Sequence, residues 1–264
     1  MPHPFCIEQL TVSAIGPVEL VTLAAELGCG AVGMALEHGP QGDLPGWSLR
    51  ENPGLRRDFA AAAADLGVAI TVGEGPSAGI DPARQAADMD LLAELGARRI
   101  SAADAGLEQS QAFDDLAGLC EMARDRGMDF VLEFGPASTI RHLPLALQAL
   151  HHIGEGRAGL LIDSMHFFRA GGTVREIADL DPALIEHVRL SDAARKGTGD
   201  YREQARTGRM IPGEGELPLR EFVDALPRGQ RLGLAVSPRI AGVRASIDEY
   251  VAETLMKTRA LLVQ

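Results

Sequence analysis

Residues 159–166 read Gly-Leu-Leu-Ile-Asp-Ser-Met-His (GLLIDSMH), an apolar run that ends in the carboxylate of Asp163 and is soon followed by the imidazole of His166. An uninterrupted apolar run predicts a strand of a parallel sheet, because both faces of such a strand are buried. The last residue of the strand then enters a protected pocket, where a carboxylate and a histidine can hold a metal ion or transfer protons. This stretch therefore predicts both a sheet of buried strands and a site at their carboxyl ends.

Two other stretches have the same form. Residues 130–133 (FVLE) are an apolar run that ends in Glu133, and residues 187–192 (HVRLSD) contain Arg189 and end in Asp192. Further strand-like runs alternate with alanine- and leucine-rich helical stretches, which is the pattern of parallel strands joined by crossover helices. The strands that we predict are Phe5–Thr11, Ala31–Leu36, Ala69–Gly73, Arg99–Ala102, Phe130–Phe134, Gly159–Asp163, His187–Ser191 and Leu232–Val236.

About eight β/α units in 264 residues predict a single α/β domain over residues 1–264, a (β/α)8 TIM barrel. Gly67 and Gly127 directly follow predicted helices and support their ends, because glycine adopts the left-handed conformation that closes a helix. An open doubly wound sheet is the rival fold, but no glycine-rich dinucleotide fingerprint follows the first strand. The insertion at about residues 196–216 has the glycines and arginines of a mobile lid, with a solvated surface loop as the alternative.

Charge and cysteine content narrow the range of partners. A net charge of -12 argues against nucleic acid, whose phosphates need a basic face. Cys6, Cys29 and Cys120 lack metal-ligand spacing and are expected to be small buried residues in a reducing compartment. The first residues lack the basic segment and the long apolar core of a signal peptide, and no apolar run is long enough for a bilayer, so we expect neither a signal peptide nor a membrane span. We therefore expect a cytoplasmic protein with a small-molecule substrate and no membrane partner, and we leave a homodimer open.

The candidate site consists of polar residues where strands end, because these face the substrate in a β/α barrel. Glu133 and Asp163 stand out, since each follows a continuous apolar run and a buried carboxylate needs a partner. Polar residues also occur wherever a strand leaves the core, so a purely structural role is the alternative for each candidate. The other residues that we expect to contact substrate are His38, Glu74, Asp192, Arg195 and Arg239.

Four segments carry a resemblance to a known family. In order and spacing, this chain resembles the xylose isomerase-like barrel superfamily at residues 130–136 (FVLEFGP), 161–172 (LIDSMHFFRAGG), 187–195 (HVRLSDAAR) and 211–217 (IPGEGEL). That group includes sugar isomerases and epimerases, inosose dehydratase-like lyases and type-two AP endonucleases. The resemblance implies a TIM barrel that acts on a sugar-derived or other hydroxy-ketone substrate, and its specific motifs cover the C-terminal half of the chain.

The resemblance also implies a divalent metal, Mn, Mg or Zn, held by the carboxylates that end strands five and six, a strand-seven His and a strand-eight Glu. Glu133 and Asp163 match the first two ligands, and His166 matches a neighbouring His that touches substrate. Arg189 stands in place of the strand-seven His, and Ala235 in place of the strand-eight Glu. Arginine cannot ligate a cation but can bridge two carboxylates. We therefore expect either no cofactor, with the Arg189 guanidinium in the space of the metal, or a weakly held metal on Glu133, Asp163 and His166.

The implied chemistry begins with removal of a proton next to a carbonyl, which leaves an enediolate that needs positive charge nearby. Glu133 is the candidate base, because loss of water raises the pKa of a carboxylate, and His166 is the candidate acid or orienting group. Arg189 is the candidate positive charge. Ala235 cannot act as a second base, which favours one-base chemistry. We expect a sugar isomerase or epimerase, with a lyase or dehydratase, or a non-catalytic partner subunit, as alternatives.

Overall fold

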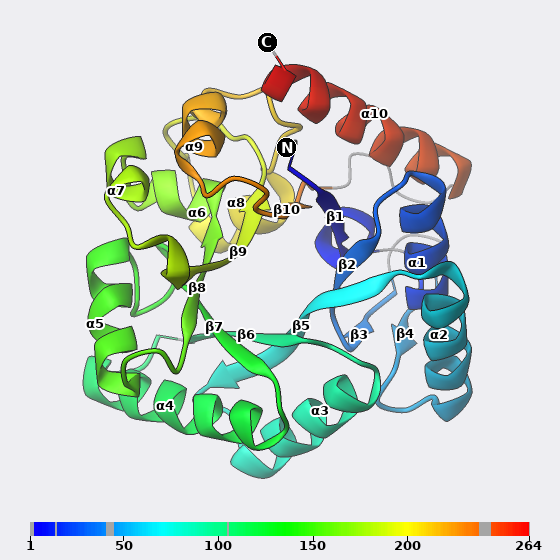
Figure 1. Cartoon of the computed structure of the whole chain (residues 1–264), viewed down its shortest axis with the longest axis horizontal. Coiled ribbons are helices and arrows are strands. Elements are labelled where there is room, and N and C mark those ends of the chain that lie inside the picture. The colour runs from blue at the N-terminus through cyan, green and yellow to red at the C-terminus, as the bar shows by residue number, and fades with distance from the viewer. Residues whose placement is uncertain (1–2, 14, 41–44, 105, 238–243, 264) are drawn as a thin grey trace.

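Eight strands pair side by side in parallel and close into a barrel, which a ring of helices surrounds (Figure 1). The computed structural model describes residues 3–13, 15–40, 45–104, 106–237 and 244–263. The strand order is β1-β10-β9-β8-β7-β6-β5-β2, and the pairing of β1 with β2 closes the ring. The predicted TIM barrel is confirmed.

All eight predicted barrel strands are present, with boundaries that differ by a few residues. A separate antiparallel pair, β3 (Glu37–His38) and β4 (Trp47–Ser48), lies in the connection that follows β2. The barrel strands are β1 (Phe5–Glu8), β2 (Ala31–Met34), β5 (Ala69–Ala78), β6 (Arg99–Asp104), β7 (Asp129–Glu133), β8 (Gly159–Asp163), β9 (Ile185–Leu190) and β10 (Leu232–Leu234).

Helices connect the strands, and the glycines that were predicted to end two of them have the expected conformation. Gly67 closes α2 with a φ of 65°, and Gly127 follows α4 with a φ of 71°. Short 3-10 turns lie at Gln9–Val12 and Pro182–Leu184. The helices are α1 (Pro17–Glu26), α2 (Pro53–Leu66), α3 (Pro82–Glu94), α4 (Gln109–Asp125), α5 (Leu143–Ile153), α6 (Ser164–Arg169), α7 (Val174–Ala178), α8 (Tyr201–Thr207), α9 (Leu219–Ala225) and α10 (Arg244–Val263).

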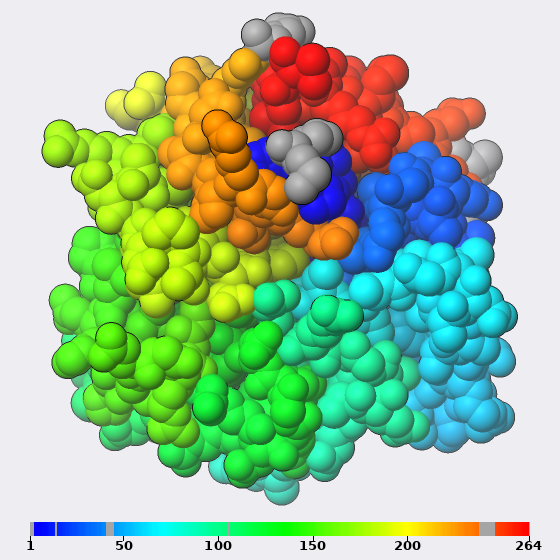
Figure 2. Space-filling model, viewed as in Figure 1, coloured from blue at the N-terminus to red at the C-terminus, as the bar shows by residue number. Residues whose placement is uncertain are grey.

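The two halves of the chain meet where the first strand pairs with the last. Phe5 lies opposite Leu232 and Ile7 opposite Leu234 in this pairing. Figure 2 shows the consequence at the surface, where the N-terminal segment, in blue, lies beside the orange and red C-terminal part. Residues that are far apart in sequence can therefore share one site inside the barrel.

Alternation of side chains along the strands builds two different environments. Ile7, Leu132 and Ile162 face outward into the main core between strands and helices. Val72, Val131 and Leu161 form a separate apolar cluster, which lies inside the barrel. The residues two positions further along the same strands are Glu74, Glu133 and Asp163. Alternation thus places these carboxylates inside the barrel, toward the carboxyl ends of the strands.

One local prediction is corrected. The first strand does not extend to Thr11, because a 3-10 turn begins at Gln9, so that Glu8 is the last residue of β1. The insertion at about residues 196–216, which was predicted to be lid-like, contains α8. Within the described part of the chain, no helix combines the length and the apolar character needed to cross a membrane.

Candidate active site

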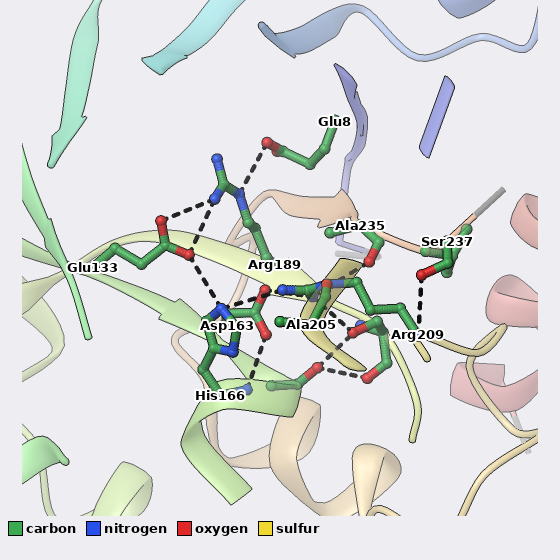
Figure 3. Close-up of polar contacts among 12 residues, drawn as sticks. Glu8, Glu133, Asp163, His166, Arg189, Ala205, Arg209, Ala235 and Ser237 are labelled. Atoms are coloured by element: carbon green, nitrogen blue, oxygen red, sulfur yellow. Dashed lines mark hydrogen bonds and ion pairs between the residues drawn. The ribbon is translucent and has the colours of Figure 1, made fainter. Parts of the chain in front are cut away.

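The Arg189 guanidinium lies at the centre of the polar layer inside the barrel. Its Nε donates to Glu8 Oε2 at 3.1 Å, and its Nη1 donates to both oxygens of Glu133 at 3.1 and 3.2 Å (Figure 3). Its Nη2 donates to Glu74. Burial alone would lower the pKa of Arg189, but these carboxylates raise it well above its usual value. One fixed cation thus joins carboxylates from β1, β5 and β7.

Glu8 is a fully buried carboxylate that accepts from the Nε of this guanidinium. Its Oε1 lies 2.9 Å from His187 Nε2, and its side chain has no exposed surface. Gly33 on β2 and Gly233 on β10 leave the space for it, because a Cβ at either position would collide with the Glu8 carboxylate. Burial raises the pKa of Glu8, but Arg189 and His187 outweigh this effect and lower the pKa to about 2.

Asp163 pairs with a second arginine. Arg209 Nη1 donates to Asp163 Oδ2 at 2.7 Å, and the other oxygen, Oδ1, caps α6 by accepting from the His166 backbone N–H at 3.0 Å. Burial raises the pKa of Asp163, but Arg209 and the helix cap lower it to about 2. Arg209 is itself buried and also donates to Ser191 Oγ and to the carbonyl of Ala205 on α8. The segment that carries α8 therefore supplies a cation to the barrel interior.

His166 lies between Glu133 and α8. Its Nε2 is 3.8 Å from Glu133 Oε1 and 3.3 Å from Arg209 Nη2, and its Nδ1 is 2.5 Å from the Tyr201 hydroxyl. Because Arg209 can only donate, Nε2 acts as the acceptor and Nδ1 carries the proton. Burial lowers the pKa of His166, although the negative charge of Asp163 acts to raise it. The imidazole is thus held neutral beside the Glu133 carboxylate.

Two cavities open at the carboxyl ends of the strands. The first, which we call the His166 cavity, has a volume of about 270 Å³. The second, which we call the Gln9 cavity, has a volume of about 470 Å³. The His166 cavity is lined by Glu133, Ser138, His166, Tyr201, Arg202 and Ala205 among others, and the Gln9 cavity by Gln9, Ala35, His38, Glu74, Arg206 and Thr207 among others.

The structure brings only some of the predicted site residues together. Glu133, Asp163, His166 and Arg189 lie in one cluster, with Glu74 joined to it through Arg189 and His38 at the Gln9 cavity. Two others lie elsewhere, and neither lines the two cavities. The carboxylate of Asp192 is buried and accepts from the backbone N–H groups of residues 193, 213 and 217, and Arg195 is exposed. Arg239 lies outside the described residues.

Glu8 and Arg209 are the site residues that the sequence did not reveal. Glu8 lay inside the first predicted strand rather than at its end, so it was not counted among the strand-end residues. The period of two was the available signal, because Glu8 follows Cys6 on the inward face of β1. Arg209 lies in a connection, 46 residues from Asp163, and no local pattern indicates that pairing.

Two groups of described residues have potential metal-ligand atoms within 4.8 Å of one another. One is Cys6, Glu8 and His187, and the other is Glu133, Asp163 and His166. In the first group, burial raises the pKa of the Cys6 thiol, and Glu8 is shared between His187 and Arg189. In the second, guanidinium groups already bind both oxygens of Glu133 and one oxygen of Asp163. The donor atoms are present, but arginines engage the carboxylates.

Comparison with known proteins gives a consistent family signal. A model of the xylose isomerase-like TIM barrel family matches residues 21–248. Fructoselysine 3-epimerase of Shigella flexneri is 27% identical over 190 residues, which cover 69% of this chain and 66% of that relative. The match thus spans just under two thirds of the relative's length.

Solved structures share the whole barrel. The crystal structure of the IOLI protein, which has a bound zinc atom, superimposes with a TM-score of 0.79 at 16% identity and covers 98% of both chains. The probable 3-DHS dehydratase AsbF from Bacillus anthracis has a TM-score of 0.71 at 17% identity, covering 96% of this chain and 98% of its own. At these identities the likeness shows a common fold, and the site must be judged on its own residues.

Proposed function

Because the chain belongs to the xylose isomerase-like TIM barrel family, we propose that it is an isomerase or epimerase that abstracts a proton next to a carbonyl. The proposed substrate is a small polyhydroxy or hydroxy-ketone compound. One observation carries the proposal: Glu133 and His166 line the same cavity, and Arg189 donates a hydrogen bond to the Glu133 carboxylate. A base, a second proton-transfer group and a fixed cation are the groups that enediolate chemistry requires.

The residues have distinct roles in this scheme. The Glu133 carboxylate removes the proton from the carbon next to the carbonyl, and His166 orients the substrate or exchanges a proton with its oxygen. Arg189 and Arg209 stabilise the negative charge that develops on the enediolate oxygen, because guanidinium groups fixed in a low-dielectric site need no reorganisation during the reaction. Arg209 also keeps the imidazole oriented through its contact with Nε2.

We infer that this site works without a resident metal ion. A metal bound by Glu133 and Asp163 would have to displace Arg189 from one carboxylate and Arg209 from the other. The Arg209–Asp163 pair is buried, and breaking such a pair costs about 3–5 kcal/mol because it leaves a charge without a partner, whereas the Arg189–Glu133 pair is part-buried. Zinc in the IOLI structure belongs to that protein, and no step here is assigned to a metal.

A lyase or dehydratase is the second candidate. Its support is the structural likeness to the probable 3-DHS dehydratase together with Ala235, which provides no second base on β10's side of the site. Elimination needs one base to remove the proton and one acid to protonate the leaving group. Glu133 fills the role of the base, and the imidazole of His166 can supply the proton only from Nδ1, through the Tyr201 hydroxyl that lines the same cavity.

The direct test is exchange of the proton next to the carbonyl for solvent deuterium. We expect the wild-type protein to catalyse deuterium incorporation into at least one member of a ketose panel that includes dihydroxyacetone, D-fructose and D-psicose, followed by NMR in D2O. Glu133→Gln should reduce the rate by about 10²–10⁴-fold, because it removes the base and preserves the shape of the side chain.

Glu121→Gln is the matched control, since Glu121 lies on the exposed surface and pairs with Arg157. It should exchange at the wild-type rate. No exchange with any ketose in the wild type would contradict the proposal, and equal rates in the wild type and Glu133→Gln would remove Glu133 from the role of base. Loss of a hydroxyl group instead of simple exchange would favour the lyase.

A further inference from the structure

Both ring nitrogens of His166 face protein groups. Nε2 lies 3.3 Å from Arg209 Nη2 and 3.8 Å from Glu133 Oε1 (Figure 3). Nδ1 lies 2.5 Å from the Tyr201 hydroxyl. Since Nε2 accepts from Arg209, it carries no proton, and the proton on Nδ1 is donated to Tyr201. The imidazole therefore acts on a bound substrate through the Tyr201 hydroxyl.

The Tyr201 hydroxyl has a proton of its own to donate. Its oxygen accepts from His166 Nδ1, and within the part of the chain that the structure describes this is its one hydrogen-bond partner. Tyr201 also lines the His166 cavity, together with Glu133. Because a hydroxyl group can accept and donate at the same time, the O–H of Tyr201 is available to a ligand in this cavity.

The surroundings of Tyr201 keep its hydroxyl protonated. Burial raises the pKa of Tyr201, and the negative charge of Asp163 raises it further. Glu133, on the same cavity, is ion-paired with Arg189. An ion-paired carboxylate can accept a proton and a neutral phenol can donate one, so the cavity has a base and an acid on its walls.

Helix α8 holds Tyr201 in this position. Tyr201 is the first residue of the helix, and its ring packs partly buried against the main core. The Asp200 side chain caps the same end of α8, and Arg202 donates to the Ala137 carbonyl at 2.9 Å. A donor that is fixed before the substrate arrives needs no reorganisation when charge develops on the substrate oxygen.

We propose that Tyr201 is a catalytic residue that donates a hydrogen bond, and then its proton, to the carbonyl oxygen of the substrate, and that His166 is a positioning residue that acts through Tyr201. The inference rests on the proposed function, in which Glu133 takes the proton from the neighbouring carbon. The electron pair of the broken C–H bond forms the carbon–carbon double bond of the enediol, and the π pair of the carbonyl moves to oxygen.

The oxygen that receives this pair forms its new O–H bond with the proton of Tyr201. The phenolate that remains keeps the hydrogen bond from His166 Nδ1, and a bond of this kind strengthens when its acceptor becomes charged. When Glu133 returns its proton to carbon, the enediol oxygen returns its proton to Tyr201. Both groups are then restored for the next turnover.

Removal of the hydroxyl alone tests the role of Tyr201. On a ketose that the wild type exchanges, Tyr201→Phe should lower the rate of deuterium incorporation by about 10²–10³-fold, because the ring stays and the acid is lost. Tyr250→Phe makes the same chemical change on α10, where the hydroxyl donates to the Ser237 carbonyl and the side chain lines neither of the two cavities. It should stay within about twofold of the wild-type rate.

Two substitutions of His166 test whether it acts through Tyr201. Asparagine retains an N–H group near the place of Nδ1, whereas leucine has none. His166→Asn should therefore be faster than His166→Leu by about tenfold, because the phenolate keeps a donor. Combined with Tyr201→Phe, the two substitutions should give equal rates, since the donor then has no oxygen to bind. A difference that persists in the Tyr201→Phe background would overturn the positioning role of His166.

Fluorination of the phenol tests Tyr201 without a substitution at that position. Tyr201 and Tyr250 are the two tyrosines of the sequence, so Tyr250→Phe grown with 3-fluorotyrosine carries the label at Tyr201 alone. Fluorine makes the phenol a stronger acid and should raise the exchange rate by about threefold. An unchanged rate in this labelled protein, or in folded Tyr201→Phe, would overturn the role of Tyr201 and leave Glu133 as the base. A wild type that exchanges no ketose would overturn the proposed function as well.

Discussion

At the scale of single residues, Arg189 is the centre of the charge network in this site. In the resemblance to sugar epimerases its position implies a metal-binding histidine, but the guanidinium instead carries a permanent positive charge to three carboxylates. Together with Asp163, these three carboxylates still carry more negative charge than Arg189 and Arg209 carry positive charge. Desolvation raises the pKa of Glu74, although Arg189 opposes this shift. The guanidinium therefore supplies positive charge to these carboxylates permanently, whereas a metal ion would supply it only while bound.

Glu8 should make the stability of the protein depend on pH. Its pKa is about 2 in the folded protein and has its ordinary value of 4.5 in the unfolded chain, so the unfolded chain takes up the proton first as the pH falls. The stabilisation by Glu8 is therefore present above pH 4.5 and is lost as the pH falls through about 2. A shift of this size corresponds to about 3 kcal/mol.

Urea denaturation of wild type and Glu8→Gln as a function of pH measures this effect. We expect wild type to be more stable by about 3 kcal/mol at pH 6 and the two curves to converge toward pH 2. The exposed Glu121→Gln variant should follow wild type throughout. A constant difference between wild type and Glu8→Gln across this range would show that Glu8 is not held ionised by Arg189 and His187.

Some site residues are predictable from sequence and others are not. Glu133 and Asp163 end apolar runs, and buried carboxylates need a counter-ion, so local pattern was enough to suggest the contact of Arg189 with Glu133, whereas Asp163 pairs with Arg209 instead. Glu8 required the correct end of β1, which the 3-10 turn at Gln9–Val12 had moved. Arg209 required knowledge of which loop folds over the barrel, and that is a property of the tertiary structure.

At the scale of elements, the strands were the most predictable part. A strand that is buried on both faces needs apolar side chains at consecutive positions, and such a run is visible in the sequence. Helix α8 was not predicted, because glycines at 197, 199 and 208 suggested a loop. Its start did carry a signal: the Asp200 side chain accepts from the Glu203 backbone N–H at 3.0 Å, which is the spacing of a helix cap.

Arg209 should hold α8 against the barrel. Arg209→Met removes the hydrogen bond to the Ala205 carbonyl and leaves Asp163 without its cation. We expect hydrogen–deuterium exchange of amides in residues 201–207 to accelerate by about tenfold or more. The protein should also lose about 3 kcal/mol of stability, since a buried charge has lost its partner.

Arg202→Met is the control for this change. Arg202 lies on α8 itself and donates to the Ala137 carbonyl at an exposed position. Its removal should alter exchange in α8 only slightly, and the stability of the protein by less than about 1 kcal/mol. Equal exchange in the two variants would mean that α8 does not depend on its tie to Asp163.

At the scale of the whole molecule, barrel closure assembles the site. Glu8 and Arg189 are 181 positions apart, and they meet because β1 pairs with β10 and β10 with β9. Sequence rhythm predicted the barrel and therefore the end at which chemistry occurs. It did not predict which side chains share a cavity, because that depends on the register between strands and on the loops above them.

The central claim is that Arg189 and Arg209 stand in place of a metal ion. Elemental analysis of the purified protein, dialysed against metal-free buffer and then incubated with Mn²⁺, Mg²⁺ or Zn²⁺ and dialysed again, tests it most directly. We expect less than about 0.1 metal ion per chain, because the carboxylates that would bind it are held by guanidinium groups. About one tightly held ion per chain after dialysis would contradict the account.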